Sequence, residues 1–586
     1  MNDQKNTILF VVLSGLILLV WSFFFVPQAP KNPTPPPPPG GSVPGPAEPP
    51  KQLTREEALK QSPRVTIETP RVAGSIALKG GRIDDLSLTQ YRETVDPNSP
   101  AIVLLSPAGG PEPFYAEYGW LAPSGTTVKR PDANTLWTQE GSGALSVGNP
   151  VRLVFDNGEG LEFRRTFSVD DKYMFSVKDE VVNKGSAPVT LNPYGLISRH
   201  GLPHLQGYSI SHEGFVGVLG DKLQEESYSA VEKKKYDFAA THGWLGITDK
   251  YWAATLIPDP AATFEGHFEY KLVGALKTYQ TVYFLNPVTV APGATAGAET
   301  RLFAGAKEVS IVDSYKNDLM IDRFDKVIDW GMFYFITKPL FLAIDWIYRF
   351  VGNFGIAILI ITVLVKILFF PLANKSYASM AKMKAVQPEM VAIRERFADD
   401  KMKQQQAMME LYKKQKINPV AGCLPIALQI PVFFALYKVL FITIEMRHSP
   451  FFGWIKDLSA PDPTNIFTLF GLIAWDPTAL PLVGSFLHIG IWPLIMGVTM
   501  FFQMKLNPPP PDPTQQMIFD WMPVIFTFML GGFSAGLVIY WAWNNTLSVI
   551  QQSVIMRKHG AKIELFDNIK RLFVKKKAEG TTSPGP

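Results

Sequence analysis

A single lysine lies within a long apolar segment, and its position is the strongest sign of chemistry in this chain. Lys366 is surrounded by residues 356–371, which are otherwise uncharged and mostly hydrophobic. An ionisable side chain at the centre of a membrane-spanning helix costs roughly 2.5–3.5 kcal/mol on insertion scales. At about 1.5 Å per residue, counting from Asn374 places the lysine about 12 Å below the membrane surface. The charge either snorkels partly toward that surface or lines a water-containing cavity open to the cytoplasm, and this depth favours the cavity.

Uncharged polar residues in other apolar segments could line the same cavity. Thr362 lies one helical turn from Lys366 and on the same face. Gln429, Asn544 and Asn545 supply polar groups from other segments. None of these residues is a carboxylate, so the predicted cavity is positive and attracts a negative group from outside. At about 5 Å and an effective dielectric constant near 20, one carboxylate gains about 3 kcal/mol, which is comparable to the cost of carrying an aspartate into the bilayer.

The scarcity of acidic groups disfavours two other classes of membrane protein. A proton- or sodium-coupled transporter normally carries Asp, Glu or His within its spans, whereas His488 and Glu445 lie near the ends of apolar segments. An intramembrane protease needs a Ser/His or paired-Asp arrangement, and no such set is recognisable. A single lysine without a charged neighbour suits attraction of a negative group, and the magnitudes permit a catalyst of membrane entry.

The segment that precedes the apolar region offers little support for a metal or catalytic site. His200 and His204 are four residues apart, but the glycine and proline between them disfavour the helix that would place both on one face. Glu213 and Glu162 could act as general acid or base, yet no partner or spacing supports that role. Cys423 is the single cysteine, which excludes a multi-cysteine metal site. We therefore expect a structural or docking domain, with no catalytic residue, no metal and no cofactor.

The composition indicates that part of the chain lies in a membrane. Charged residues make up 18% of the 586 residues, against about 25% in a typical soluble protein. The hydrophobic fraction of 47% is ordinary, so the excess must be concentrated in separate runs. The net charge of +4 is too small to predict a nucleic-acid partner. Six runs suit a membrane-spanning helix, namely residues 7–26, 352–372, 420–444, 488–506, 517–531 and 534–550.

The segments around the first runs have distinct roles. Residues 7–26 are longer than the apolar region of most signal peptides and lack a small-residue cleavage site, so an uncleaved anchor is favoured over a signal peptide. Residues 27–63 are proline-rich and predict an extended spacer. Residues 330–350 are apolar but carry Lys338, Asp345 and Arg349, which predicts an amphipathic helix in the membrane interface.

Basic residues set the predicted orientation. Residues 374–417 and the tail that begins near residue 557 are rich in Lys and Arg, whereas residues 447–481 have no basic excess. Because basic loops stay in the cytoplasm, six spans place both chain ends and residues 374–417 on the cytoplasmic side. That basic loop predicts a hairpin of two helices, 376–397 and 401–417. Its methionines either fill the seam between these helices, which we favour, or bind varied apolar segments.

Residues 64–313 have a different pattern. Apolar and polar residues alternate over short runs such as 64–68, 161–167 and 281–284, and turn signals such as Asp156-Asn157-Gly158 interrupt them. Period-two patterning with regular breaks over this length predicts a large antiparallel β-sandwich on the extracytoplasmic side.

Several strings of residues in the apolar region resemble one family. They are PLANKSYASMAKMKAVQPEMVAIRERF, NPVAGCLPIALQIPVFFALYKVL, MGVTMFF, DPTQQMIFDWMPVIFTF and SAGLVIYWAWNNTLSVIQQ. They look like the bacterial YidC membrane protein insertases of the Oxa/YidC family, and the anchor, spacer and large β-domain resemble the Gram-negative members. The resemblance implies an inner-membrane insertase and chaperone that acts alone or with the Sec translocon. It also implies a hydrophilic groove open to the cytoplasm, and a periplasmic β-supersandwich similar to sugar-binding folds but without an established enzymatic role.

Two positions depart from the family pattern. The groove position is usually arginine, and Lys366 keeps the charge but not the planar fork of donors. The last run often has two adjacent tyrosines where this chain has Tyr540 and Trp541, which still suit contact with a passing apolar helix. The predicted substrate groove is formed by Lys366, Thr362, Gln429, Tyr540, Trp541 and Asn544.

The predicted organisation combines an α-helical polytopic membrane part, with six transmembrane helices and a five-helix insertase core, and an all-β periplasmic domain. The expected partners are nascent membrane-protein substrates, the Sec translocon, membrane lipids and the ribosome, which the hairpin and basic tail would receive. The alternative function is a membrane-anchored periplasmic protein that binds or modifies carbohydrate. The predicted segments are an anchor at 1–26, a linker at 27–63, a β-sandwich at 64–318, an interfacial helix at 330–350, a core at 352–555 that includes the hairpin 374–417, and a basic tail at 556–586.

Overall fold

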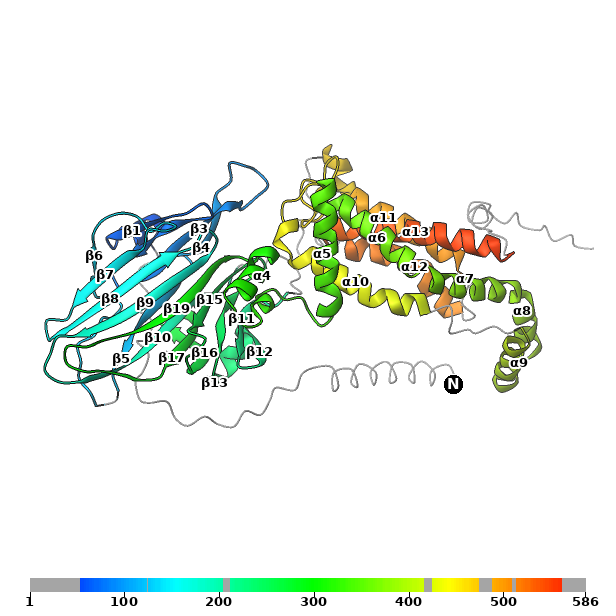
Figure 1. The fold of residues 1–586 in the computed structure, drawn as a ribbon. Coiled ribbons are helices and arrows are strands. Elements are labelled where there is room, and N and C mark those ends of the chain that lie inside the picture. The colour runs from blue at the N-terminus through cyan, green and yellow to red at the C-terminus, as the bar shows by residue number, and fades with distance from the viewer. Residues whose placement is uncertain are drawn as a thin grey trace, which may run out of the picture.

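The chain forms an all-β part followed by a helical part, and the two lie next to each other (Figure 1). The computed structural model describes residues 53–123, 125–203, 211–415, 424–473, 487–507 and 513–560. The predicted anchor, most of the proline-rich linker and the tail beyond residue 560 lie outside the described residues. His204 and Cys423 lie outside them as well.

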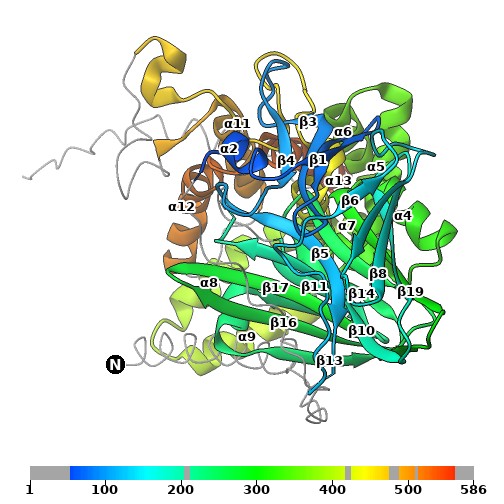
Figure 2. The same ribbon diagram turned by 90° about the vertical axis from the view of Figure 1, so that its left-hand side faces the viewer.

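Two sheets of antiparallel strands form the all-β part, which confirms the β-sandwich expected from the alternating pattern (Figure 2). The larger sheet has ten strands in the order β1-β2-β3-β5-β10-β17-β16-β13, with β4 beside β3 and β18 beside β10. Its strands are β1 (Arg64–Glu68), β2 (Val72–Ala77), β3 (Arg82–Arg92), β4 (Ala101–Leu105), β5 (Phe114–Leu121), β10 (Val189–His200), β13 (Tyr236–Ala240), β16 (Phe264–Val273), β17 (Leu276–Leu285) and β18 (Val288–Val290).

The smaller sheet has nine strands in the order β12-β11-β14-β15-β19-β9-β8-β7-β6. Its strands are β6 (Thr138–Glu140), β7 (Val151–Asp156), β8 (Leu161–Val169), β9 (Met174–Asn183), β11 (Gly214–Leu219), β12 (Lys222–Ser227), β14 (Gly243–Thr248), β15 (Trp252–Pro258) and β19 (Thr295–Ala306).

Strand β8 and the turn before it show how local sequence produces this fold. Side chains along β8 alternate strictly between buried and half-buried positions, as expected when one face of a strand meets a core. The preceding turn is stabilised by Asn157, whose Oδ1 accepts the backbone N–H groups of Glu159 (2.8 Å) and Leu161 (3.0 Å). Gly158 adopts a φ of 71°, which glycine tolerates without steric cost.

The buried side chain of Arg165 forms polar contacts with both sheets. It lies on β8, is 1% exposed, and pairs with Asp179 on β9 at 2.6 Å. Its other nitrogens donate to the backbone carbonyl of Gly81, just before β3, at 2.8 Å, and to that of Tyr118 on β5 at 2.7 Å. The guanidinium also lies 4.9 Å from the Trp137 ring. A buried charge is tolerated here because a carboxylate and two carbonyl groups satisfy it.

Helices make up most of the C-terminal part, and α4 and η1 connect it to the sheets. Two short helices, α2 (Arg55–Leu59) and α3 (Tyr228–Lys233), belong to the all-β part. The others are α4 (Val309–Asp318), η1 (Phe324–Val327), α5 (Tyr334–Val351), α6 (Phe354–Leu368), α7 (Phe370–Ala385), α8 (Gln387–Arg396), α9 (Lys401–Lys414), α10 (Leu424–Ile442), η3 (Ile444–Met446), η4 (Ile466–Gly471), α11 (Ile491–Leu506), α12 (Pro513–Leu530) and α13 (Ala535–Lys558).

The helix predicted at residues 352–372 ends early. α6 stops at Leu368, and α7 continues at an angle of 67° to it. Pro371 accounts for the bend, because proline lacks the N–H that would continue the α6 hydrogen-bond ladder and its ring crowds the carbonyl four residues earlier. Lys366 therefore lies in the last turn of α6 rather than in the middle of a straight span. Within the described residues, no unbroken helix combines the length and hydropathy of a membrane crossing, whereas α6 and α7 do so as a bent pair.

The predicted hairpin also differs in its first arm. Residues 376–397 are divided between α7 and α8, and Pro388 in the first turn of α8 explains the break. α8 and α9 then pack against each other, with Met390 buried and Met408 partly buried in their seam. Met402, by contrast, is exposed. The prediction that methionines fill the seam between the helices is therefore confirmed for Met390 and Met408.

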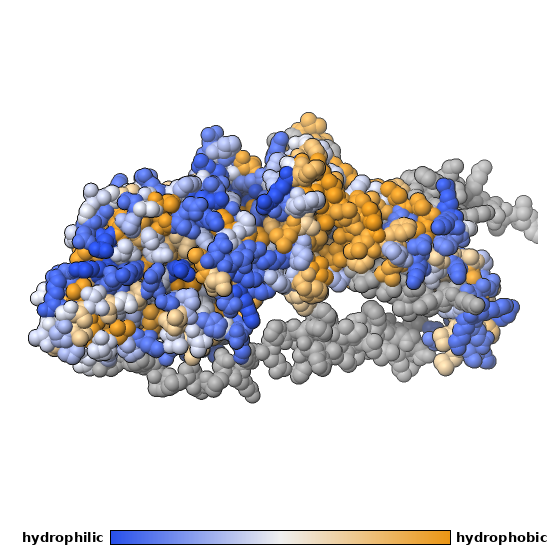
Figure 3. Space-filling view, in the orientation of Figure 1, coloured by the Kyte–Doolittle hydropathy of each residue, from blue (hydrophilic) through white to orange (hydrophobic). Residues whose placement is uncertain are grey.

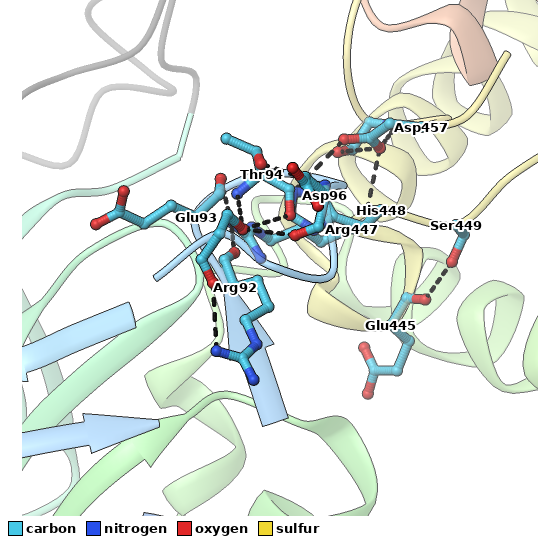
Figure 4. A network of polar contacts seen from close by, with 11 residues as sticks. Arg92, Glu93, Thr94, Asp96, Glu445, Arg447, His448, Ser449 and Asp457 are labelled. Atoms are coloured by element: carbon cyan, nitrogen blue, oxygen red, sulfur yellow. Dashed lines mark hydrogen bonds and ion pairs between the residues drawn. The ribbon is translucent and has the colours of Figure 1, made fainter. Parts of the chain in front are cut away.

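Polar contacts fasten the all-β part to the helical part. Asp329, between η1 and α5, accepts from Lys438 on α10 at 2.6 Å and from the backbone N–H of His212, between β10 and β11, at 2.7 Å. Arg447, shortly after α10, donates to the backbone carbonyls of Arg92 (2.7 Å) and Glu93 (3.2 Å), which end β3 and begin the β3–β4 connection (Figure 4). The Arg447 contacts join segments about 350 residues apart, so the β-sandwich and the helices are in direct contact.

Helix α5 is amphipathic, as the sequence predicts for residues 330–350, although it begins only at Tyr334. Ile344 is buried in the core, and Lys338 donates to Asp313 on α4 at 2.7 Å. The charge that interrupts the apolar pattern is thus satisfied within the protein. Large apolar side chains remain exposed on the other face, namely Phe335, Leu342, Trp346 and Phe350.

Candidate functional site: a pocket beside Lys366

A pocket lies among the helices of the C-terminal part, next to Lys366. Helices α6, α7, α10 and α13 contribute most of its wall, and α5 contributes Leu340. The apolar lining consists of Leu340, Ile361, Val365, Phe369, Leu372, Ala373, Val432 and Leu436. The polar lining consists of Thr362, Lys366, Tyr377, Gln429, Tyr540, Asn544 and Gln551. A mainly apolar wall lowers the local dielectric constant, so the one cation in this described lining acts more strongly than it would in water.

The Lys366 side chain reaches from α6 to α13. Its Nζ donates to the Ser548 hydroxyl oxygen at 2.7 Å. Thr362, one turn earlier on α6, is 4% exposed, and its hydroxyl donates to the Ile358 carbonyl at 2.6 Å. The Thr362 proton is therefore used within its own helix, and its oxygen presents acceptor lone pairs.

Five of the six residues predicted for the groove line this one pocket, namely Lys366, Thr362, Gln429, Tyr540 and Asn544. The sixth, Trp541, is not among the lining residues. Its ring packs 4.8 Å from the ring of Phe433 and 5.6 Å from that of Phe526. Consecutive residues on a helix point about 100° apart, so α13 turns Tyr540 toward the pocket and Trp541 toward neighbouring aromatic side chains.

Sequence reasoning missed Ser548, Tyr377 and Gln551. Ser548 and Gln551 follow Asn544 by four and seven positions, which is the spacing of residues on one helical face. Extending the polar stripe from Asn544 along the last apolar run could have identified both. Tyr377 offers no such signal, because its place depends on the bend between α6 and α7.

Other ionisable residues of the apolar segments lie elsewhere. Asp520, near the start of α12, pairs with Lys505 of α11 at 2.8 Å. His488 donates from Nε2 to the Asp462 backbone carbonyl at 2.8 Å in the loop region before α11. Glu445 follows α10 and accepts the Val309 N–H at 2.7 Å, and burial raises the pKa of its carboxyl to about 7. The described pocket lining therefore contains no acidic group that would neutralise Lys366.

In the all-β part, two of the residues considered for catalysis, His200 and Glu162, form contacts that are typical of a structural role. His200 lies 3.3 Å from the Ser198 hydroxyl, and burial lowers its pKa to about 4, so its ring is neutral near pH 7. Glu162 accepts hydrogen bonds from Lys184 and Arg164, and these lower the pKa of its carboxyl. Among the residues that the structure describes, no three His, Cys, Asp or Glu side chains are grouped as a metal site would require.

The surface of the helical part is strongly apolar. A broad hydrophobic area covers the helical part, in contrast to the mixed surface of the β-sandwich (Figure 3). The helices that line the pocket also carry exposed apolar residues outside its lining, namely Leu364 and Ile367 on α6, and Ile430 and Phe434 on α10. An exposed apolar area of this kind marks a surface that contacts lipid or another apolar segment.

Comparisons with known proteins cover nearly the whole chain. A family model described as the YidC periplasmic domain matches residues 64–343, and one described as 60Kd inner membrane protein matches residues 346–562. The chain is 60% identical to the membrane protein insertase YidC of Bradyrhizobium diazoefficiens, over 98% of this chain and 100% of that protein. It is 59% identical to that of Nitrobacter hamburgensis, over 99% of each. A crystal structure of an active YidC insertase covers 93% of this chain and 98% of its own, at 18% identity and a TM-score of 0.36.

These matches confirm the resemblance that the sequence suggested. They extend through both the all-β part and the helical part, and the relatives are aligned over essentially their full length. The chain therefore belongs to the YidC family of membrane protein insertases, bacterial inner-membrane proteins with a periplasmic domain.

Proposed function

We propose that this insertase receives the polar or acidic segment of a substrate in the pocket beside Lys366. The observation that supports the proposal is the convergence of five predicted residues, from three helices distant in sequence, around a single lysine. The described lining adds no carboxylate to this set. The pocket therefore suits a transient ligand that brings its own negative charge.

The magnitudes agree with such a role. A carboxylate about 5 Å from the lysine gains about 3 kcal/mol at an effective dielectric constant near 20. Moving an aspartate into the centre of a bilayer costs roughly 2.5–3.5 kcal/mol on insertion scales. The pocket thus offsets most of that cost while remaining weak enough to release the segment. No bond is made or broken, so the protein acts by lowering a barrier to transfer.

The apolar part of the substrate leaves the pocket sideways into lipid. The proposal is supported by the exposed apolar side chains that the two pocket-lining helices carry on their outer faces, Ile430 and Phe434 on α10 and Leu364 and Ile367 on α6. Tyr540 faces the pocket and contacts the passing helix, whereas Trp541 supports this wall from behind through Phe433.

The proposal also covers the arrangement of the whole chain in the membrane. The chain has six membrane spans, with both termini and the α8–α9 hairpin in the cytoplasm and the β-sandwich in the periplasm. The hairpin and the basic tail receive the ribosome and nascent chain, the α5 face lies against lipid, and some substrates are shared with the Sec translocon. The β-sandwich serves as a structural or docking domain.

Cysteine labelling tests this orientation. With Cys423 replaced, a single cysteine introduced at Ser379 is expected to be protected from an impermeant thiol reagent in intact cells, whereas one at Ser459 is expected to react. The reason is the basic excess of the loop that contains Ser379. Permeabilised cells control for intrinsic reactivity, and labelling in the opposite sense would require an inverted topology.

Replacement of Lys366 tests the pocket. We expect Lys366→Ala to slow insertion of a substrate with an aspartate-containing translocated tail by about tenfold to a hundredfold, because up to about 3 kcal/mol of attraction is lost. A matched substrate with asparagine in place of aspartate should be affected much less. Lys366→Arg keeps the positive charge and should retain most of the insertion of both substrates. Insertion into vesicles that contain only the purified chain measures the rates.

A different result is expected if Lys366 only destabilises its helix and does not attract the substrate. Its removal would then stabilise the protein by up to roughly 3 kcal/mol and leave insertion unchanged. Thermal unfolding in detergent should therefore be recorded beside the insertion rates. An Ala variant that inserts the aspartate substrate at the rate of the parent chain would rule out the electrostatic role, whatever its stability.

A further inference from the structure

We propose that Ser548 holds the Lys366 ammonium in position and thereby determines how strongly the pocket favours acidic over neutral segments. This inference rests on the proposed function of the pocket and adds a positioning residue behind its lining. Ser548 lies on α13, 182 positions along the chain from Lys366, and is 1% exposed. It is therefore placed to act on the lysine without contacting the substrate.

Two hydrogen bonds meet at the Ser548 hydroxyl. Its proton is donated to the Asn544 backbone carbonyl at 2.7 Å, and its oxygen accepts an N–H of Lys366 at 2.7 Å. A hydroxyl has one proton and two lone pairs, so the first bond commits the proton and turns the lone pairs toward the ammonium. An ammonium has three N–H groups. The bond to Ser548 fixes its position with one of them, and two remain for a ligand.

Position matters because lysine is a point charge on a flexible stem. Coulomb attraction falls with distance, and an unrestrained side chain of this kind extends toward water where it can. Loss of the Ser548 oxygen would let the ammonium move away from the pocket. The attraction felt by an acidic segment would weaken, whereas the contacts that serve a neutral segment would stay the same.

A purely structural role for Ser548 makes a different prediction. A serine that bonds the carbonyl four residues earlier slightly destabilises its helix, and alanine is the stronger helix former. Ser548→Ala would then leave the protein equally stable or more stable and leave substrate preference unchanged. Thr546 is a matched control, because its hydroxyl donates to the Ala542 carbonyl at 2.8 Å on the same helix and does not line the pocket.

The test compares Ser548→Ala, Ser548→Thr and Thr546→Ala in the full chain reconstituted into vesicles. Two substrates are used that differ only by aspartate or asparagine in the translocated tail. We expect Ser548→Ala to lower the ratio of aspartate to asparagine insertion about tenfold, the effect of losing one hydrogen bond to a charged group. Ser548→Thr keeps the hydroxyl and should rescue most of that ratio. Thr546→Ala should leave it unchanged.

A second comparison uses the Lys366→Arg background. The guanidinium has five N–H donors on a planar fork, so its position depends less on one acceptor. Ser548→Ala should therefore change the ratio less than about threefold there. An effect as large as in the parent chain would contradict the positioning role.

The outcomes separate this inference from the proposed function. If Lys366→Ala lowers the ratio but Ser548→Ala does not, the inference is overturned and the proposed function stands. If Ser548→Ala slows both substrates equally, its role is structural and the inference is again overturned. If even Lys366→Ala leaves the ratio unchanged, the proposed function of the pocket fails, and the inference fails with it.

Discussion

The Lys366→Glu variant is expected to prefer a substrate with a basic translocated tail over one with an acidic tail, the reverse of the parent chain. An attraction of about 3 kcal/mol for a carboxylate at about 5 Å becomes a repulsion of similar size when the glutamate is ionised. Because the attraction is lost and a repulsion is added, insertion of the acidic substrate should fall by more than it does in Lys366→Ala, by at least about a hundredfold.

Three matched substrates with aspartate, asparagine or lysine at one tail position measure this effect in vesicles. The asparagine substrate controls for any general loss of pocket shape, because it carries no charge. In the parent chain the order of rates should be aspartate, asparagine, lysine, and Lys366→Glu should reverse it. A uniform fall for all three substrates would show that the substitution damages the fold and that charge does not govern the order.

The second large effect is expected in the β-sandwich. Replacing Arg165 by methionine leaves the Asp179 carboxylate buried without its cation, and removes the guanidinium donors from the Gly81 and Tyr118 carbonyls. Removal of one partner from a buried ion pair costs about 3–5 kcal/mol. We therefore expect the near-ultraviolet circular dichroism transition of the β-sandwich to shift to a clearly lower temperature in the full chain.

Neighbouring substitutions make this prediction specific. Arg164 is the next residue on β8, and its side chain is 37% exposed and paired with Glu162, so Arg164→Met should cost less than about 1 kcal/mol. The double variant Arg165→Met with Asp179→Leu removes both charges and should recover much of the loss. Equal destabilisation by Arg164→Met and Arg165→Met would contradict the role of Arg165 in joining the two sheets. Insertion of simple substrates should persist below the transition, because the proposed pocket lies in the helical part.

Local patterns in the sequence were sufficient for much of the fold. Alternation at period two predicted the strands of residues 64–313. The turn at Asp156-Asn157-Gly158 was correct because hydrogen bonds to Asp156 and Asn157 and the positive φ of Gly158 all arise within it. The amphipathic pattern at 330–350 predicted α5, and the cost of a charge in an apolar run singled out Lys366. These features depend on residues within one or two turns of each other, so they can be read without knowledge of the packing.

Helix ends were less accurate for an equally local reason. The apolar run at 352–372 appears continuous by hydropathy, but Pro371 divides it into α6 and α7. Likewise, Pro388 divides the first arm of the predicted hairpin. Hydropathy records which residues can lie in an apolar environment, but it does not record that a proline removes a helix hydrogen bond and crowds the preceding turn, which can bend or end the helix. Giving these prolines more weight would have placed Lys366 in a last helical turn.

The tertiary structure alone showed which polar residues meet. Gln429, Asn544 and Asn545 all supply polar groups to apolar runs, and the predicted groove included the first two. In the structure Gln429 and Asn544 line the pocket, whereas Asn545 lies 3.5 Å from Thr499 on α11. Trp541 was paired with Tyr540 by adjacency, but the two rings occupy different faces of α13. The contact between Lys366 and Ser548 spans 182 positions. Such contacts depend on the rotation and crossing of packed helices, which are set by side chains from several elements at once and leave no periodic signal in any one of them.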